Sequence, residues 1–301
     1  MKTIIVGAVE STKVTFDKMI EHDLYPSLVI TVPKEKSHIH SDYVDMESLA
    51  RSNNIDVICE LNVNKEHVLE KVRSIGPHVI FVVGWSRICG PDFMALAQMG
   101  VIGYHPAPLP KLRGRAALAW TIILGLKETA GSVFWMDEGT DSGHIAEQEF
   151  FELHDRIDLP QLIVKHSAAL ATMLDRLLPK LTDGQKACTP QDQSAATYLA
   201  VRRPADSEID WRDNSVGIDR LVRSVTRPYP GAFTWLDGRK IYIWEVVPVS
   251  YPEWHALEGQ VFLYDGDMPV VRCGEKTDLK ILNYSAEKEG SKPLSGQVRF
   301  R

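Results

Sequence analysis

The sequence predicts an α/β protein, in which a parallel, helix-covered sheet of the doubly wound type is followed by a smaller domain of short strands. Two observations carry this prediction. In the first half, short apolar runs alternate with segments of helical periodicity, which is typical of repeated βαβ units. In the second half, short strand-like runs are separated by turn residues, which is typical of a small β domain. The 301 residues suffice for one large and one small domain.

The first half contains short apolar runs that predict buried strands, with helical segments between them. We expect these strands at 2–6, 28–32, 55–59, 79–83 and 101–105. We expect the helices at 15–22, 46–52 and 65–75. Farther along, we expect a helix at 117–124, strands at 131–136 and 145–151, and a long amphipathic helix at 159–181.

Residues 182–197 are polar and poor in large apolar side chains, so we interpret them as a linker. This interpretation places one domain at residues 1–190 and a second at 200–301. The second domain is expected to contain one helix and five short strands. The helix is expected at 215–225 and the strands at 232–235, 240–247, 260–264, 269–272 and 279–282.

The composition indicates a globular protein without a membrane partner. Hydrophobic residues make up 44% of the chain and charged residues 25%. No run approaches the roughly 20 apolar residues that span a bilayer, and the N-terminus resembles a strand rather than a signal peptide. The cysteines are scattered and form no C-x-x-C pair, so we expect reduced thiols in a cytoplasmic protein. They are Cys59, Cys89, Cys188 and Cys273.

The charge distribution bears on nucleic acid as a partner. The net charge is −6, and residues 201–301 carry equal numbers of basic and acidic side chains. A protein that grips a nucleic-acid backbone usually shows a basic excess, because it must neutralise phosphates. Nucleic acid is therefore not the expected partner, although folding can gather basic residues on one face.

The segment H-P-A-P-L-P-K-L-R-G-R, residues 105–115, is the main functional motif and is called the proline loop below. Its prolines fix φ and remove backbone donors, which gives a stiff extended loop directly after an apolar strand. In open α/β sheets, ligands bind beyond the carboxyl ends of strands, and His105 stands at such an end. His105 and Asp141, in the later D-S-G-H segment, are therefore candidates for moving protons during acyl transfer. The structural alternative is that His105 ends a strand and Asp141 belongs to a turn.

These motifs resemble those of the folate-dependent formyltransferases. Members of that family carry an Asn-x-His pair at a strand end, then an L-P-x-x-R-G loop and an Asp in a D-x-G turn. Here His105, residues 109–114 and Asp141 match. The second half is similar as well, in R-P-A-D-S-E-I-D-W at 203–211 and in L-V-R-S-V-T-R-P-Y-P-G-A-F at 221–233.

The resemblance implies a Rossmann-like formyltransferase domain and a small C-terminal barrel of the oligonucleotide-binding (OB) type. It implies transfer of a formyl group from N10-formyltetrahydrofolate to an amine, and the closest likeness is to enzymes acting on nucleotide-linked amino sugars. Similar sugar-acting enzymes are often homodimers, but the sequence leaves the oligomeric state and the sugar open. Two alternatives remain, a methionyl-tRNA formyltransferase and a non-catalytic folate- or nucleotide-binding homologue.

The resemblance also implies the walls of a pterin pocket. One wall is the loop after the fourth strand, where Trp85 would supply an apolar surface, and the opposite wall begins at Met136. The alternative is that the tryptophan is buried in the core and the glycine has a structural role, without contact to a ligand. The candidate cofactor-binding residues are Gly84, Trp85, Ser86, Arg87, Ile88, Met136 and Asp137.

Four residues are candidates for binding the substrate. Arg113 and Arg115 are forked cations suited to phosphates or to the folate tail, with surface solvation as the alternative. Gly7 follows the first strand and would allow a phosphate to approach the backbone. Tyr104 lies beside His105 but faces the other side of a regular strand.

Gly103 departs from the family pattern, because it occupies the place of the asparagine. An asparagine amide there would donate to the formyl oxygen, and losing one such donor typically costs about 10²–10³ in rate. Three accounts remain: a donor from elsewhere (Ser86, a backbone amide or water), a slower enzyme, or binding without catalysis. We prefer the first.

No metal site and no nicotinamide or flavin cofactor is predicted. G-A-V-E-S after the first strand is not a G-x-G-x-x-G fingerprint. His38, His40, Asp42 and Asp45 match no metal-ligand spacing and are interpreted as a solvated loop.

Overall fold

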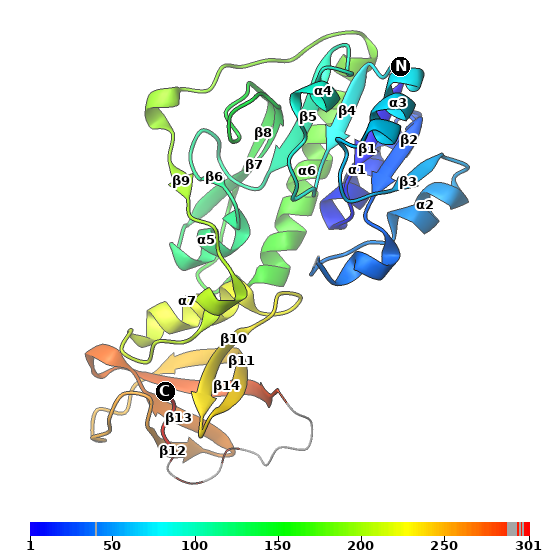
Figure 1. Cartoon of the computed structure of the whole chain (residues 1–301). Helices are drawn as coiled ribbons and strands as arrows, with labels where there is room; N and C mark the ends of the chain where they lie inside the picture. The colour runs from blue at the N-terminus through cyan, green and yellow to red at the C-terminus, as the bar shows by residue number, and fades with distance from the viewer. Residues whose placement is uncertain (40, 288–293, 295, 297) are drawn as a thin grey trace. The chain divides into compact units, whose positions relative to one another are not determined.

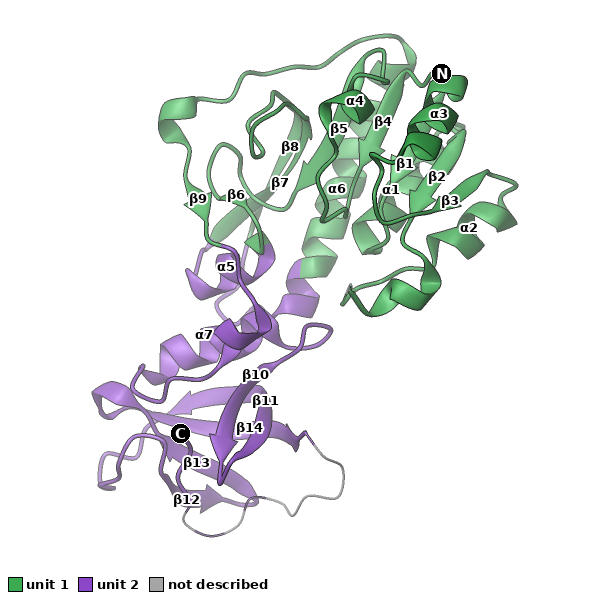
Figure 2. Ribbon diagram, viewed as in Figure 1, with its two compact units in different colours: residues 1–117, 128–152, 163–200 green, residues 118–127, 153–162, 201–301 purple. Residues whose placement is uncertain are grey.

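The computed structural model describes residues 1–39, 41–287, 294, 296 and 298–301. Contacts between residues divide the chain into two compact units (Figure 2). Unit 1 comprises Met1–Ala117, Glu128–Glu152 and Ile163–Ala200, and unit 2 comprises Leu118–Lys127, Leu153–Leu162 and Val201–Arg301. Two short segments of the first 190 residues therefore group with the C-terminal part of the chain. Within the described residues, no helix has the length and apolar character needed to cross a bilayer.

Unit 1 is built on a seven-stranded sheet in the order β3-β2-β1-β4-β5-β7-β8 (Figure 1). Strands β1 to β5 pair in parallel, whereas β7 and β8 are antiparallel. The strands are β1 Thr3–Val6, β2 Leu28–Thr31, β3 Val57–Cys59, β4 Val79–Val82, β5 Gly100–His105, β7 Glu128–Trp135 and β8 Ile145–Glu152.

Helices cover both faces of this sheet, which explains why the central strands are apolar throughout. Every residue of β1, β2 and β4 is buried. One core lies against α1, α2 and α6, and the other lies against α3 and α4. These helices are α1 Glu10–Glu21, α2 Met46–Ser52, α3 Glu66–Ile75, α4 Pro91–Met94 and α6 Leu159–Thr182. The first four residues of α6 group with unit 2, as does helix α5 Ala117–Ile123 apart from its first residue.

The Rossmann-like α/β architecture is confirmed, with two differences from the predicted elements. The sheet is mixed, because only residues 136–144 connect β7 to β8, too few for a parallel crossover. Helix α1 begins at Glu10 rather than near residue 15. Thr12 stabilises this early start, since its Oγ1 accepts the Val9 N–H at 3.2 Å and donates to the Val83 carbonyl at 2.7 Å.

The polar segment 183–199, called the strap below, is not the linker predicted from its composition. It belongs to unit 1 and lies along it (Figure 2). Thr189 and Ile145 exchange two backbone hydrogen bonds of 2.8 Å. The short strand β9, Tyr198–Leu199, pairs in parallel with β6, Arg113–Gly114. The strap is therefore bound to the proline loop and to β8 through its backbone.

Unit 2 contains a five-stranded antiparallel sheet in the order β10-β11-β14-β13-β12, packed against α7. Its core joins Trp211 and Phe300 to apolar residues of the helix and the strands. A C-terminal antiparallel β domain is thus confirmed. The OB-like barrel is not confirmed, because the described strands form an open sheet. The elements are α7 Ser215–Val225, β10 Ala232–Leu236, β11 Arg239–Val249, β12 Val261–Asp265, β13 Met268–Arg272 and β14 Asp278–Ala286.

Candidate active site

His105 is the last residue of β5 and lies at the carboxyl edge of the parallel strands. Its side chain is buried, with the residue 5% exposed. Nε2 lies 2.7 Å from the carbonyl oxygen of Leu112, which can only accept, so Nε2 carries the proton of this hydrogen bond. The proline loop therefore curls back and fixes the orientation of the ring. Nδ1 is left facing the other side of the site.

Asp141 stands opposite that nitrogen. Its Oδ2 lies 3.6 Å from His105 Nδ1 and accepts the backbone N–H of Gly114 at 2.8 Å. A separation of 3.6 Å is too long for a direct hydrogen bond, and both atoms are acceptors when Nε2 carries the ring proton. A group with two N–H or O–H donors, lying beside the line between them, can therefore donate to both. The backbone of Asp141 is left-handed, with φ of 49°. The structure thus brings the two residues proposed for proton transfer together, and their chemical roles stay proposals.

Two polar side chains that the sequence analysis missed, on β7 and β8, hold the proline loop by hydrogen bonds to its carbonyls. Ser132 of β7 is fully buried and donates to the Ala107 carbonyl at 2.7 Å. Gln148 of β8 donates to the Leu109 carbonyl at 2.9 Å and to Ser132 Oγ at 2.8 Å. These hydrogen bonds provide side-chain donors for the carbonyls of Ala107 and Leu109, in a loop whose prolines have no N–H to donate. A serine inside an apolar strand was the available signal.

Arg113, a candidate for substrate binding, is buried in the structure, and its contact with a ligand stays a prediction. It is 1% exposed. Its Nε and Nη2 donate to Gln191 Oε1 at 3.2 and 2.6 Å, and its Nη1 donates to Gln193 Oε1 at 2.9 Å and to Tyr198 Oη at 3.3 Å. All of these partners lie on the strap. Burial and these bonds make Arg113 the anchor of the strap rather than a free cation.

Gln191 is a third side chain that the sequence analysis missed. It is 6% exposed, and its Nε2 donates to the carbonyls of Asp141 at 2.8 Å and Gly143 at 2.6 Å. One amide therefore connects Arg113 of the proline loop to the turn that carries Asp141. No motif marks this glutamine, because it lies in a polar segment without periodicity.

The other candidate substrate-binding residues fall in different surroundings. Arg115 is exposed. A Cβ on Gly7 would lie 2.0 Å from the Val83 carbonyl oxygen and 2.2 Å from Thr12 Oγ1, so close packing already explains that glycine. Binding of a phosphate at Gly7 stays a prediction.

Tyr104 points away from His105, as expected for the next residue of a strand. Its hydroxyl lies 2.9 Å from Nδ1 of His166, which belongs to α6. This contact places the Tyr104 side chain in the layer between the sheet and α6, and its predicted role in substrate binding stays a prediction. Burial, with a smaller contribution from nearby His105, lowers the pKa of His166 to about 3, and burial raises the pKa of Tyr104.

The loop after β4 has features suited to a flat heterocyclic ligand. Gly84 is required at its start, because φ is 69° and a Cβ would lie 2.1 Å from Val9 Cγ2. Trp85 Nε1 is buried and has no hydrogen-bond partner within the described residues. Ser86 and Arg87 are exposed, and Ile88 is 84% exposed. The buried Trp85 N–H is thus an unsatisfied donor in the described structure, whereas a single exposed isoleucine such as Ile88 is ordinary.

Gly103 lies on β5 two residues before His105, with side chains packed where its Cβ would be. That Cβ would lie 3.0 Å from ring atoms of Phe134 and 3.1 Å from Met136 Cγ. A larger side chain at this position therefore needs these neighbours to move. Asp137, on the same side of the site, accepts from the Gly139 N–H and the Ser142 hydroxyl and so forms a turn.

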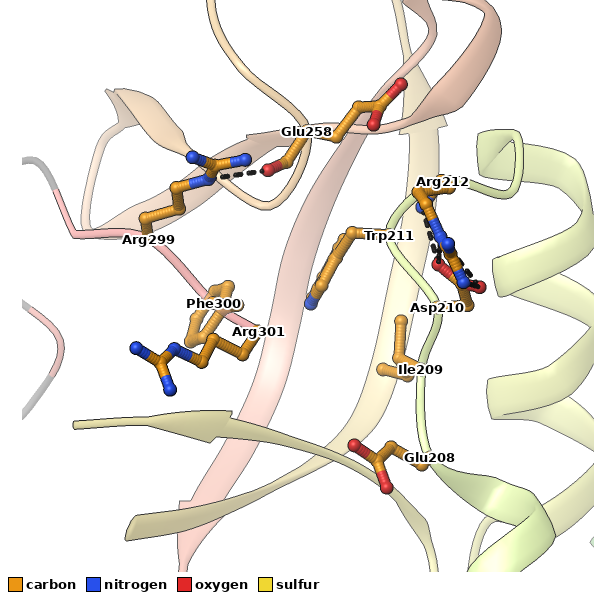
Figure 3. A pocket seen from close by; sticks show the side chains of 9 residues that line it. All are labelled: Glu208, Ile209, Asp210, Trp211, Arg212, Glu258, Arg299, Phe300 and Arg301. Atoms are coloured by element: carbon orange, nitrogen blue, oxygen red, sulfur yellow. Dashed lines mark hydrogen bonds and ion pairs between the residues drawn. The ribbon is translucent and has the colours of Figure 1, made fainter. Parts of the chain in front are cut away.

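Two cavities in unit 2 contain none of the predicted site residues. The first, of about 480 Å³, is lined by the stacked pair Trp211 and Phe300 and by three arginines and three carboxylates (Figure 3). The second, of about 330 Å³, includes Trp244, with the Arg227 guanidinium 4.4 Å from its ring centroid. Arginines and acidic side chains are equal in number in the first cavity, whereas the second has three arginines and two carboxylates. No group of three or more metal-ligating side chains is found in the described part of the chain, and His40 lies outside it.

Comparison with known proteins defines the class. Residues 22–166 match a family model described as formyl transferase, and residues 202–301 match one described as formyl transferase, C-terminal domain. The chain belongs to the formyl transferase family, so the predicted formyltransferase is confirmed at the level of family.

Solved structures similar in fold include HypX from Aquifex aeolicus in complex with tetrahydrofolic acid, with a TM-score of 0.68 and 14% identity over 96% of this chain. The chain spans 45% of that protein. An N-formyltransferase from Helicobacter canadensis, in complex with folinic acid and dTDP-3-aminofucose, has a TM-score of 0.67 and 13% identity over 93% of this chain and 98% of its own. Methionyl-tRNA formyltransferase from Clostridium thermocellum has a TM-score of 0.60 and 20% identity over 82% and 93%.

Proposed function

We propose that this protein transfers a formyl group from N10-formyltetrahydrofolate to the amine of a nucleotide-linked amino sugar. The observation that carries the proposal is the His105–Asp141 pair, separated by 3.6 Å at the carboxyl edge of the sheet of a formyl transferase chain. Residues 1–190 would form the catalytic domain and 200–301 the C-terminal domain. A cytoplasmic location and a homodimer remain predictions.

The pair is suited to removing a proton from the attacking amine. When a neutral amine attacks the formyl carbon, the nitrogen becomes positively charged and must lose a proton. Because His105 Nε2–H donates to the Leu112 carbonyl, the neutral ring accepts at Nδ1, on the side of Asp141. An amine between these two groups would meet an imidazole and a carboxylate together. In the proposed mechanism, the proton passes to the Asp141 carboxylate or to His105 Nδ1, whose imidazolium Asp141 would stabilise. The bond between the formyl carbon and N10 then breaks, and the pair would return the proton to N10 as tetrahydrofolate leaves.

The loop after β4 supports folate as the formyl donor. When bound, the folate supplies the formyl group, and its pterin offers ring acceptors and flat apolar faces. Trp85 Nε1 is the orphaned donor that fits such an acceptor, and Ile88 offers open apolar surface in the same loop. Gly84, Ser86 and Arg87 would contribute backbone groups, with Met136 and Asp137 on the opposite wall.

The donor to the formyl oxygen would come from a residue other than 103, because Gly103 has no side chain and Phe134 and Met136 fill the adjoining space. Ser86, a backbone amide or a bound water would take that role. The sugar nucleotide is favoured over tRNA because the net charge is −6 and the C-terminal hundred residues show no basic excess.

The test is calorimetric titration with a stable N10-formyltetrahydrofolate analogue and, separately, with a panel of nucleotide-linked amino sugars. Binding of both supports the proposal and identifies the amine to assay. A salt-sensitive affinity for initiator tRNA, without sugar-nucleotide binding, would replace it with the methionyl-tRNA activity. Sugar-nucleotide binding without folate affinity would mean that the scaffold persists without formyl chemistry.

A further inference from the structure

Gln191 uses its entire side-chain amide to join two loops of the candidate site. Its Oε1 accepts two N–H groups of Arg113, at 3.2 and 2.6 Å. Its Nε2 donates to the carbonyls of Asp141 at 2.8 Å and Gly143 at 2.6 Å. An amide offers two donors and one acceptor oxygen, so no hydrogen-bonding capacity is left for a ligand. At 6% exposure, Gln191 is a structural connector beneath the site and not a contact to substrate.

The turn that it holds needs external support. Asp141 has φ of 49°, a left-handed conformation that a residue with a Cβ rarely adopts without fixed neighbours. Gln191 binds the carbonyls on both sides of Ser142, which fixes the path of the turn. The Asp141 carboxylate then accepts the N–H of Gly114, the residue after Arg113, at 2.8 Å. The turn is therefore linked to the proline loop twice, through Gln191 to Arg113 and through the Asp141 carboxylate to Gly114.

We propose that Gln191 is the positioning residue that sets the Asp141 carboxylate opposite His105, through the backbone of residues 141–143. Arg113 serves as its fixed base, since its buried guanidinium binds the amide oxygen and so orients the NH₂ group toward the turn. The expected effect of Gln191 on the catalytic rate rests on the proposed function. Its expected effect on the conformation of residues 141–143 does not.

Gln193 provides a matched comparison on the same strap. Its Oε1 also accepts from Arg113, at 2.9 Å, but its Nε2 reaches only the backbone of Gln191, at 3.4 Å. Loss of Gln193 therefore removes one anchor of Arg113 and leaves the turn at 141–143 bonded. If the strap only stabilises the fold, replacing either glutamine should have a similar effect on the turn. If Gln191 positions Asp141, only its replacement should affect the turn.

The decisive variant is Gln191→Glu. The carboxylate still accepts from Arg113 and keeps the strap in place, but it has no N–H for the carbonyls of Asp141 and Gly143. Gln191→Met removes both halves of the amide and serves as the second variant. Gln193→Met is the control. Thermal unfolding confirms that each variant is folded before it is compared.

The readout that does not require activity is amide hydrogen exchange measured by NMR. We expect the Gly114 amide, which donates to Asp141 Oδ2, to exchange about tenfold faster in Gln191→Glu. The Arg113 amide, which donates to the Thr197 carbonyl at 2.9 Å, should keep its protection there and report an intact strap. The Gln193→Met variant should leave the Gly114 amide unchanged.

The kinetic readout is the split between kcat and KM for formyl transfer. Gln191→Glu should lower kcat roughly 10- to 100-fold while KM for the folate stays within about twofold, because the reacting groups move and the folate loop does not. Unchanged Gly114 exchange in folded Gln191→Glu, or equal effects of Gln193→Met, would overturn the positioning role. If the wild-type protein shows no turnover, the proposed function fails, and the exchange data still decide the role of Gln191.

Discussion

Two segments of unit 1 meet at the candidate site, and they differ in how they contribute. The proline loop, residues 105–115, supplies His105 and is stiffened by prolines. The strap, residues 183–199, supplies no group for the reaction. It supplies Gln191 and Gln193, whose amides hold Arg113 and the turn of Asp141. One segment carries the proposed chemistry, and the other fixes the geometry in which it can occur.

The comparison shows why the two segments differ so much in sequence. The proline loop is recognisable because prolines, glycine and histidine have special backbone or titration properties. The strap works through side-chain amides, which many polar segments also contain. The strongest way to test this division is to remove groups from each segment and measure activity and stability separately.

The largest effect is expected at the proposed chemical pair. His105→Gln and Asp141→Asn should each lower kcat by about 10²–10⁴ while the protein stays folded. Asparagine suits position 141 because it tolerates the left-handed backbone there. His144→Gln is the control, since His144 is an exposed histidine in the same turn. Steady-state kinetics decide the matter, and equal activity of His105→Gln and wild type would remove His105 from the mechanism.

The next effect concerns stability and separates the two arginines of the R-G-R motif. Arg113→Met should lower the free energy of unfolding by about 2–4 kcal/mol, because it leaves the buried amide oxygen of Gln191 without its donors. Arg115→Met, at an exposed position, should change it by less than about 0.5 kcal/mol. Urea denaturation measures both. The reverse order would show that Arg113 is not the anchor of the strap.

A smaller effect is expected at the position that departs from the family motif. Gly103→Asn should destabilise the fold by about 1–3 kcal/mol, because its Cβ would lie 3.0 Å from the Phe134 ring. Adding Phe134→Leu should recover part of this loss, and a double-mutant cycle gives the coupling. The rate should not rise in the single variant. A large gain in rate without loss of stability would implicate the missing asparagine donor instead.

The effect that is smallest near neutral pH, and grows only on acidification, is a pH dependence from His166 in the layer between the sheet and α6. The pKa of buried His166 is about 3 in the folded protein, below the roughly 6.5 of an unfolded histidine. Below pH 6.5 the unfolded state therefore binds more protons, so stability falls as the pH falls toward 3 and is unaffected above 6.5.

The His166→Gln variant should lose about 1.4 kcal/mol per pH unit of this slope between about pH 4 and 6, measured by urea denaturation. His154→Gln, at an exposed histidine, should keep the wild-type slope. An unchanged slope in His166→Gln would mean that His166 is not buried in its neutral form.

Much of the fold was predictable because its signals are local. The apolar runs of β1, β2 and β4 and the periodicity of α6 and α7 placed these elements within a few residues. The antiparallel pairing of β7 with β5 and with β8 was not predicted, because the residues of a strand do not specify its direction. Only the short connection at residues 136–144 requires it, for β7 and β8.

At the site, His105 and Asp141 could be singled out because each stands in a recognisable turn or strand end. The burial of Arg113 was not predicted, because a sequence does not distinguish a cation aimed at a ligand from one buried among amides. Gln191, Ser132 and Gln148 were missed for the same reason. Their contributions arise from partners far along the chain, which only the folded structure brings together.

The central claim is that the His105–Asp141 pair performs formyl transfer in a site held together by the strap. The most direct measurement is an assay in which the purified protein is mixed with N10-formyltetrahydrofolate and each nucleotide-linked amino sugar that binds it, with the product followed by mass spectrometry. The account predicts a formylated sugar nucleotide with the wild type and almost none with Asp141→Asn. Absence of product for every amine, although the folate binds, or an equal yield from Asp141→Asn, would contradict it.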